Sequence, residues 1–190
     1  MNDFILGAKH IMDPNGFDHM LFLVALAAAF DLSKSWRMIL LATAFTVGHS
    51  LTLFLAGMDL VRASRDWIEF LIPVSIMFMA IAATLGISLA VKDSKFNKAT
   101  YALTVFFGLI HGLGFSSFFR IAADRGEGIV IPLLKFNLGV EVGQIIILLI
   151  TLSIFSLGRS LGVTERLQQI FIGGLTLGLS TIMAIEKLPL

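Results

Sequence analysis

All four histidines of this chain lie within or beside apolar segments, where an ionisable side chain is unusual. They are His10, His19, His49 and His111. A polar group in apolar surroundings raises the free energy of the fold unless it has a partner, so such residues are candidates for function. The alternative for each one is a packing residue that hydrogen-bonds to a neighbouring helix. Four histidines placed in this way favour a shared site.

His19 follows an acidic residue, Asp18, in the stretch GFDHMLF. Adjacent residues of a helix point about 100° apart, so the two cannot share one helix face. At a helix entrance, however, both can reach into one cavity. Asp18 can then bind a cation directly or orient a metal-binding histidine from behind. The alternative is that Asp18 caps the N-terminus of the helix.

His49 lies in the middle of an apolar stretch, TAFTVGHSLTL. Thr46 precedes it by three residues and shares its helix face, whereas Ser50 turns away by about 100°. His111 lies in FFGLIHGLGF, with glycines on both sides. These glycines leave room for another group to approach the imidazole.

A polar stripe follows from the spacing of Asn137, Glu141 and Gln144 in FNLGVEVGQ. They stand at i, i+4 and i+7, which places them on one face of a helix. A carboxylate at this depth must be paired, protonated or bound to a cation. Hydrogen bonds that pack helices together are the alternative for the two amides.

Glu69 precedes Pro73 in the stretch WIEFLIPVS. Proline has no N–H, so the carbonyl one turn earlier, that of Glu69 itself, loses its donor. Two interpretations stay open: Glu69 lines a polar pocket, or it lies at the boundary between lipid and water.

The types of these side chains indicate the class of metal. Imidazoles combined with carboxylate or amide oxygens suit a divalent transition metal such as nickel, cobalt, zinc or copper. The chain has no cysteine. This excludes disulfides, thiolate metal sites and cysteine nucleophiles.

The composition identifies the environment that must surround these residues. Of 190 residues, 57% are hydrophobic and 14% are charged, and the mean hydropathy is +0.92. Soluble domains are roughly a quarter charged, so lipid must be the solvent for most of the surface. The net charge of +1 gives no reason to expect nucleic acid as a partner. Acidic residues in the first 16 positions, MNDFILGAKHIMDPNG, argue against a cleavable signal peptide.

Six apolar blocks are long enough, or nearly so, to be membrane-spanning helices. They run from about 17 to 30, 38 to 56, 67 to 90, 100 to 119, 129 to 157 and 167 to 185. The first block is short, so a seventh helix, N-terminal or re-entrant, can carry His10 to membrane depth. We therefore predict an all-α fold, a polytopic transmembrane helix bundle that forms one domain over residues 1–190. Glycines at four-residue spacing, such as Gly108 and Gly112, predict close helix packing.

Four stretches resemble the HupE/UreJ family of membrane proteins: HIMDPNGFDHMLFL, AFTVGHSLTL, FGLIHGLGF and FNLGVEVGQ. The resemblance implies a six- or seven-helix protein of the bacterial inner (plasma) membrane that is linked to nickel or cobalt uptake. The family's first motif, a histidine followed by Asp-His, corresponds to His10, Asp18 and His19, with a longer spacing than in nickel permeases. His111 matches the later His-Gly motif. The acidic residue expected after that motif is absent from GLGFSSFF, and Glu141 is the candidate to replace it.

The favoured function is transport of a divalent metal ion across the lipid bilayer, with the four histidines, Asp18 and Glu141 as metal-binding or proton-handling groups. An intramembrane zinc-dependent hydrolase is the alternative, because three histidines with Asp18 and Ser50 resemble the ligands of seven-helix ceramidase and adiponectin-receptor hydrolases. Glu141 would then act as general base. A metal-binding accessory or sensor protein is a third hypothesis. The sequence also permits a homo-oligomer. A polar path on both sides of the site would favour transport.

Overall fold

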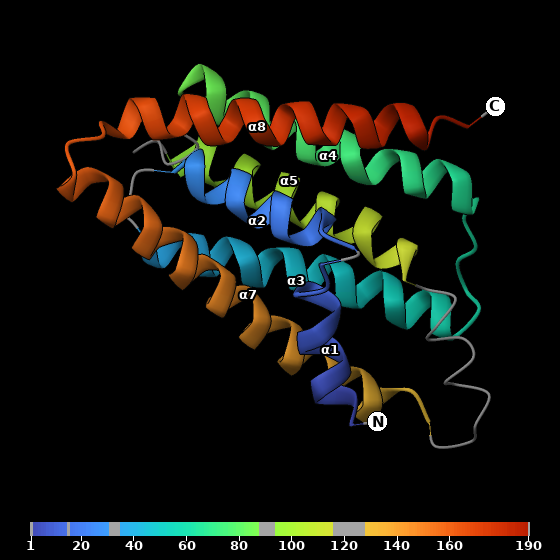
Figure 1. Cartoon of the computed structure of the whole chain (residues 1–190). Helices are drawn as coiled ribbons and strands as arrows, with labels where there is room; N and C mark the ends of the chain where they lie inside the picture. The colour runs from blue at the N-terminus through green and yellow to red at the C-terminus, as the bar shows by residue number, and fades with distance from the viewer. Residues whose placement is uncertain (1, 15, 31–34, 88–93, 116–127, 190) are drawn as a thin grey trace.

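The computed structural model describes residues 2–14, 16–30, 35–87, 94–115 and 128–189. Within these ranges the chain forms seven α-helices and no strands. Figure 1 shows their arrangement. The helices are α1 (Asp3–Ile11), α2 (Asp18–Ala28), α3 (Ser35–Gly57), α4 (Arg65–Leu85), α5 (Ser94–Gly114), α7 (Val130–Ser160) and α8 (Glu165–Glu186).

Each of the six apolar blocks contains a helix, and α1 is the additional N-terminal helix that carries His10. Four helices, α3, α4, α7 and α8, are long and apolar enough to cross a membrane. The first block gives α2, which has 11 residues and is shorter than the roughly 20 that a perpendicular span needs. The chain is therefore an all-α integral membrane protein. The ends of the third and fourth blocks, 88–90 and 116–119, lie outside the described residues.

Helix α2 is short but lies at the centre of the bundle. Seven of its 11 residues are buried, and α3, α4, α7 and α8 all contact it. A helix surrounded in this way needs no polar face. This explains the uniformly apolar sequence MLFLVALAA that follows His19.

Glycines bring neighbouring helices into backbone contact. A Cβ atom on Gly108 of α5 would overlap the carbonyl oxygen of Phe45 on α3, and one on Gly48 of α3 would overlap that of Val105 on α5. Gly139 of α7 meets α1 at Phe4 in the same manner. The predicted close packing is therefore confirmed at Gly108 and Gly139. The same four-residue spacing predicts it for Gly174 and Gly178, and there the prediction is wrong, since no described atom lies within 4 Å of the added Cβ.

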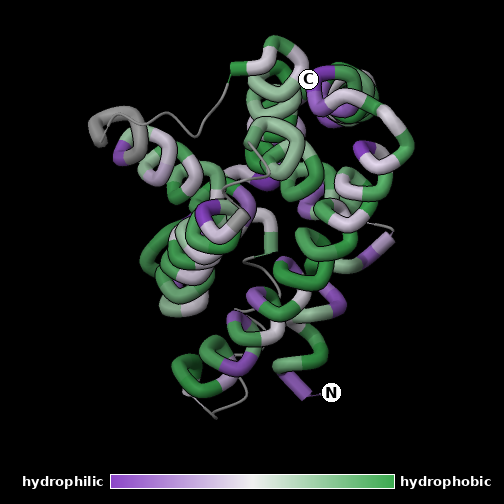
Figure 2. Tube along the Cα trace, turned by 90° about the vertical axis from the view of Figure 1, so that its left-hand side faces the viewer, coloured by the Kyte–Doolittle hydropathy of each residue, from purple (hydrophilic) through white to green (hydrophobic). Residues whose placement is uncertain are grey.

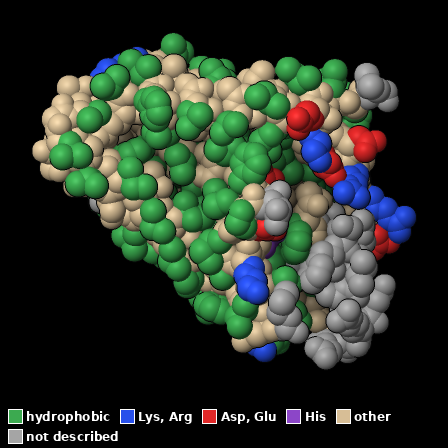
Figure 3. All heavy atoms as spheres, in the orientation of Figure 1, with side chains coloured by type: hydrophobic (Ala, Val, Ile, Leu, Met, Phe, Trp, Pro, Cys, Tyr) green, Lys and Arg blue, Asp and Glu red, His purple; other side chains and the backbone are tan. Residues whose placement is uncertain are grey.

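The outer surface is apolar around the bundle. Leu134, Leu138 and Ile154 on α7 are each at least 60% exposed, and hydrophobic side chains cover most of the face in Figure 3. Hydrophobic stretches run through the helices in Figure 2, with hydrophilic residues between them. Lipid satisfies such a surface, whereas water does not. Charged side chains gather in Figure 3 where α4 begins and α8 ends.

Candidate metal centre

Four different helices bring the four histidines to one place. His10 lies in the last turn of α1, His19 is the second residue of α2, His49 is in the middle of α3, and His111 is near the end of α5. The ring centre of His19 is 4.7 Å from that of His10, 5.8 Å from that of His49 and 5.0 Å from that of His111. His19 is therefore the centre of the cluster.

Two overlapping groups could each hold a metal ion. One consists of His10, His19 and His49, and the other of Asp18, His19 and His111. Within each group, one ligand atom per residue lies within 4.8 Å of the others. Imidazole nitrogens that bind a tetrahedral metal at 2.0–2.1 Å stand about 3.3 Å apart. In each group the candidate atoms thus lie within about 1.5 Å of the separation that a tetrahedral ion requires.

Glycine packing fixes two of these histidines relative to each other. The α5 glycines Gly108 and Gly112, one on each side of His111, both press against the backbone of α3. Gly108 meets Phe45 and the amide of His49, and Gly112 meets the carbonyl of His49. Because the contacts involve backbone atoms, His49 and His111 are held on facing helices at a fixed distance.

Three of the four histidines are buried, yet several ring nitrogens of the cluster have no partner among the described residues. His49 is fully buried, and His19 and His111 are 4% and 1% exposed. Both nitrogens of His49, Nε2 of His10 and His19, and Nδ1 of His111 lack a hydrogen-bond partner among the described residues. Buried polar atoms are normally paired, so a cluster of unpaired ones needs an explanation. A bound cation would supply it.

Asp18 orients His19. Its Oδ1 lies 2.9 Å from Nδ1 of His19 and also accepts the backbone N–H of His19 at 2.8 Å. A carboxylate only accepts hydrogen bonds, so Nδ1 of His19 carries the proton and Nε2 keeps its lone pair. This is the carboxylate–histidine arrangement found behind many metal ligands.

Aromatic side chains cover the histidines on the side of the core. Phe45 lies against His19, His49 and His111, and Phe136 of α7 stacks on His49 with an interplanar angle of 11°. Phe115 packs on His10 with ring centres 4.1 Å apart. The histidines are therefore packed among phenylalanine rings, which offer no competing ligand.

A second polar group joins α3 and α7. Thr46 donates to Oε1 of the fully buried Gln144 at 2.9 Å, and Thr43 donates to Oε1 of Glu141. Oε2 of Glu141, Nε2 of Gln144 and Oδ1 of Asn137 have no partner within the described ranges. Glu141 and Gln144 of the predicted stripe thus face α3, but Glu141 lies outside both ligand groups. Ser50 donates to the carbonyl of Thr46 in its own helix.

Glu69 lies on the route from the histidines to the surface. It pairs with Arg65 of its own helix at 2.5 Å and with Lys187 after α8. It also lines a hollow of about 230 Å³ that includes His19 and His111. Glu69 therefore lines a polar hollow and is also ion-paired, while its position at the boundary between lipid and water stays a prediction. Figure 3 shows acidic and histidine atoms in a hollow on this face.

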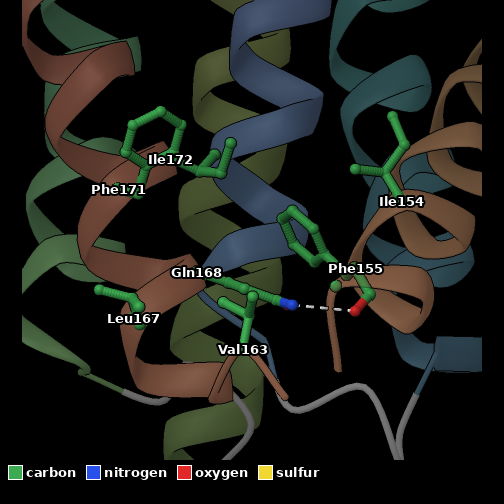
Figure 4. Close-up of a pocket in the computed structure, with 8 residues that line it drawn as sticks. Ile154, Phe155, Val163, Leu167, Gln168, Phe171 and Ile172 are labelled. Atoms are coloured by element: carbon green, nitrogen blue, oxygen red, sulfur yellow. Dashed lines mark hydrogen bonds between the residues drawn. The ribbon is translucent and has the colours of Figure 1, made fainter. Parts of the chain in front are cut away.

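A separate apolar hollow of about 360 Å³ lies between α7 and α8. Figure 4 shows Ile154, Leu167 and Phe171 among the side chains around it. Its polar member, Gln168, donates to the carbonyl of Phe155 at 3.0 Å. None of the four histidines lines this hollow.

Two polar contacts of the site involve residues that the sequence analysis did not select. Ser75 of α4 lies 2.9 Å from Nε2 of His111, and Thr43 is the partner of Glu141. Both are hydroxyl residues inside apolar blocks. The reasoning applied to Thr46 would have identified them, had it been extended to every hydroxyl within the spans.

Comparison with known proteins agrees with the resemblance. A model of the HupE / UreJ protein family matches residues 1–186. The chain belongs to the HupE/UreJ family. This HupE/UreJ chain is also 27% identical to the urease accessory protein UreH of Bacillus sp. (strain TB-90), over 60% of its own length and 57% of that protein. The match therefore spans little more than half of the curated relative. No solved structure matches the chain.

Proposed function

We propose that this protein is a multi-pass transporter of a divalent transition metal, of nickel or cobalt type, in a bacterial plasma membrane. One observation carries the proposal: four histidines from four helices converge with buried ring nitrogens that have no partner among the described residues. His10, His19, His49 and His111 would bind the ion. Asp18 would orient His19, and Glu141 would handle protons beside the site.

The donor chemistry supports this class of metal. Neutral imidazoles suit nickel, cobalt, zinc and copper, whereas magnesium and calcium prefer oxygen ligands. Membership of the HupE/UreJ family and the likeness to a urease accessory protein favour nickel within this group. The ion is the transported substrate and must be able to leave, so a site that can bind through either of two overlapping ligand groups suits transport.

Access to the histidines is asymmetric. A hollow with polar walls leads outward past Asp13, Glu69 and Lys187, whereas Phe22, Phe45 and Phe136 cover the cluster on the side of the core. An alternating-access transporter open to one side has this form. Movement of the helices that carry the aromatic rings would be needed to open the other side.

Nickel flux into proteoliposomes tests the proposal. Purified protein is reconstituted around a nickel-quenched dye, and quenching is followed after nickel addition. We expect saturable uptake by the wild type and at least tenfold slower uptake by His19→Ala, since its ring contacts the other three histidines. Gln168→Ala is the control, because this buried amide lies in the apolar hollow of Figure 4.

Two outcomes would contradict transport. Equal uptake by the wild type and His19→Ala would show that the cluster is not on the path. Stoichiometric nickel binding without any flux would instead identify a metal-binding accessory protein.

A further inference from the structure

Ser75 contacts the histidine cluster from a fifth helix. It lies on α4, is 2% exposed, and is held beside His111 of α5. Its Oγ is 2.7 Å from the carbonyl oxygen of Ile72 and 2.9 Å from Nε2 of His111. Both distances are within hydrogen-bond range.

The hydrogen atoms of these two contacts can be assigned by elimination. A serine hydroxyl has one proton to donate and two lone pairs to accept with. The carbonyl of Ile72 can only accept, so the hydroxyl proton of Ser75 is used there. The contact with His111 must then run the other way, with Nε2–H donating to Oγ.

This assignment determines which nitrogen of His111 is available. A neutral imidazole that carries its proton on Nε2 has a lone pair on Nδ1. Nδ1 of His111 is buried and has no hydrogen-bond partner in the described part of the chain. His111 also belongs to the ligand group formed with Asp18 and His19. Nδ1 is therefore the atom that can bind an ion there.

We infer that Ser75 is a positioning residue that holds His111 with its proton on Nε2, so that Nδ1 faces the metal. The inference rests on the proposed function, because it gives this hydroxyl a role at the proposed metal site. Ser75 thereby does for His111 what Asp18 does for His19. The cluster would bind its ion through Nε2 of His19 and Nδ1 of His111.

The tautomer can be read directly in the metal-free protein. When the protein is labelled with ¹⁵N-histidine, its NMR spectrum contains the signals of only four imidazole rings. The ring whose signals are missing in His111→Gln is that of His111. We expect the ¹H–¹⁵N pattern of wild-type His111 to show a protonated Nε2 and an unprotonated Nδ1. In Ser75→Ala this preference should be lost, while His19 keeps its pattern. A proton on Nδ1 of wild-type His111 would overturn the positioning role.

Nickel affinity supplies the second readout. Loss of a group that orients a metal ligand typically costs 10- to 100-fold in affinity. We expect such a loss for Ser75→Ala and recovery to within about threefold in Ser75→Thr, which restores a hydroxyl. Ser180→Ala is the matched control, since Ser180 is fully buried and, among the described residues, its hydroxyl bonds to carbonyls of its own helix. Unchanged affinity in Ser75→Ala would refute the inference.

The two experiments separate this inference from the proposed function. If the wild type binds no nickel, the proposed metal site is wrong, and so is the role of Ser75 in orienting His111 toward a metal. A chain that binds and transports nickel, but in which His111 is protonated on Nδ1, overturns the role of Ser75 alone.

Discussion

Replacement of Gly108 by alanine should push α3 and α5 apart. The new Cβ would overlap the carbonyl oxygen of Phe45 and lie 3.0 Å from the amide nitrogen of His49. Both atoms belong to backbone, which cannot rotate away as a side chain can. Gly174→Ala is the matched control, because it is the same change in a helix and nothing lies within 4 Å of the added Cβ.

The expected difference follows from two opposing terms. Alanine is preferred over glycine inside a helix by about 0.8–1.0 kcal/mol, and this gain applies at both positions. Overpacking typically costs about 1–3 kcal/mol, and it applies only at Gly108. With the cost at its upper end, Gly108→Ala is about 2 kcal/mol less stable than the wild type and about 3 kcal/mol less stable than Gly174→Ala.

Thermal unfolding in detergent, followed by circular dichroism, measures this difference. For a chain of this size, 1 kcal/mol corresponds to about 2–4 °C in Tm, so the two variants should differ by about 6–12 °C. Gly108→Ala should also bind nickel more weakly, since the displaced helices carry His49 and His111. Equal Tm values for the two variants would refute the reasoning that α3 and α5 meet at Gly108.

Three further predictions concern other contacts. Thr46→Val leaves an oxygen of the buried Gln144 without its hydrogen-bond donor. The free energy of unfolding, measured by thermal unfolding, should fall by about 1–3 kcal/mol. A fall of less than about 0.5 kcal/mol would contradict this prediction. Glu69→Gln removes exposed ion pairs, so stability should change by less than about 1 kcal/mol. At low salt, nickel binding followed by stopped flow should be slower in Glu69→Gln than in the wild type, because the carboxylate no longer attracts the cation. The difference between the two rates should shrink as salt screens the charge, and a difference that does not depend on salt would contradict an electrostatic role for Glu69. Nickel at 100 times its Kd should stabilise the wild type by about 2.7 kcal/mol. This shift should be absent in His19→Ala, which removes the histidine shared by both ligand groups, and its persistence there would place the ion elsewhere.

The helices could be predicted from hydropathy because lipid imposes a simple rule on sequence. A span needs roughly 20 apolar residues, and its backbone must satisfy its own hydrogen bonds. The block from 38 to 56 therefore matches α3, Ser35–Gly57, closely. The weak signal at the N-terminus also indicated α1, because His10 needed a helix to reach the other histidines.

Which helix faces which could not be predicted, because that depends on contacts between distant residues. Periodicity placed Asn137, Glu141 and Gln144 on one face of α7 without showing what that face would meet. Glu141 and Gln144 meet Thr43 and Thr46, so Glu141 is not a member of either ligand group. Ser75 escaped notice because a hydroxyl in a helix usually bonds only to its own backbone, as Ser180 does.

The nickel content of the purified protein tests the central claim most directly. Wild type, His19→Ala and Gln168→Ala are loaded with nickel at neutral pH, desalted and analysed by mass spectrometry. The account predicts one ion per chain in the wild type and in Gln168→Ala, and loss of the ion in His19→Ala, because His19 belongs to both ligand groups. A wild type without nickel, or equal nickel in all three proteins, would contradict a metal site formed by these histidines.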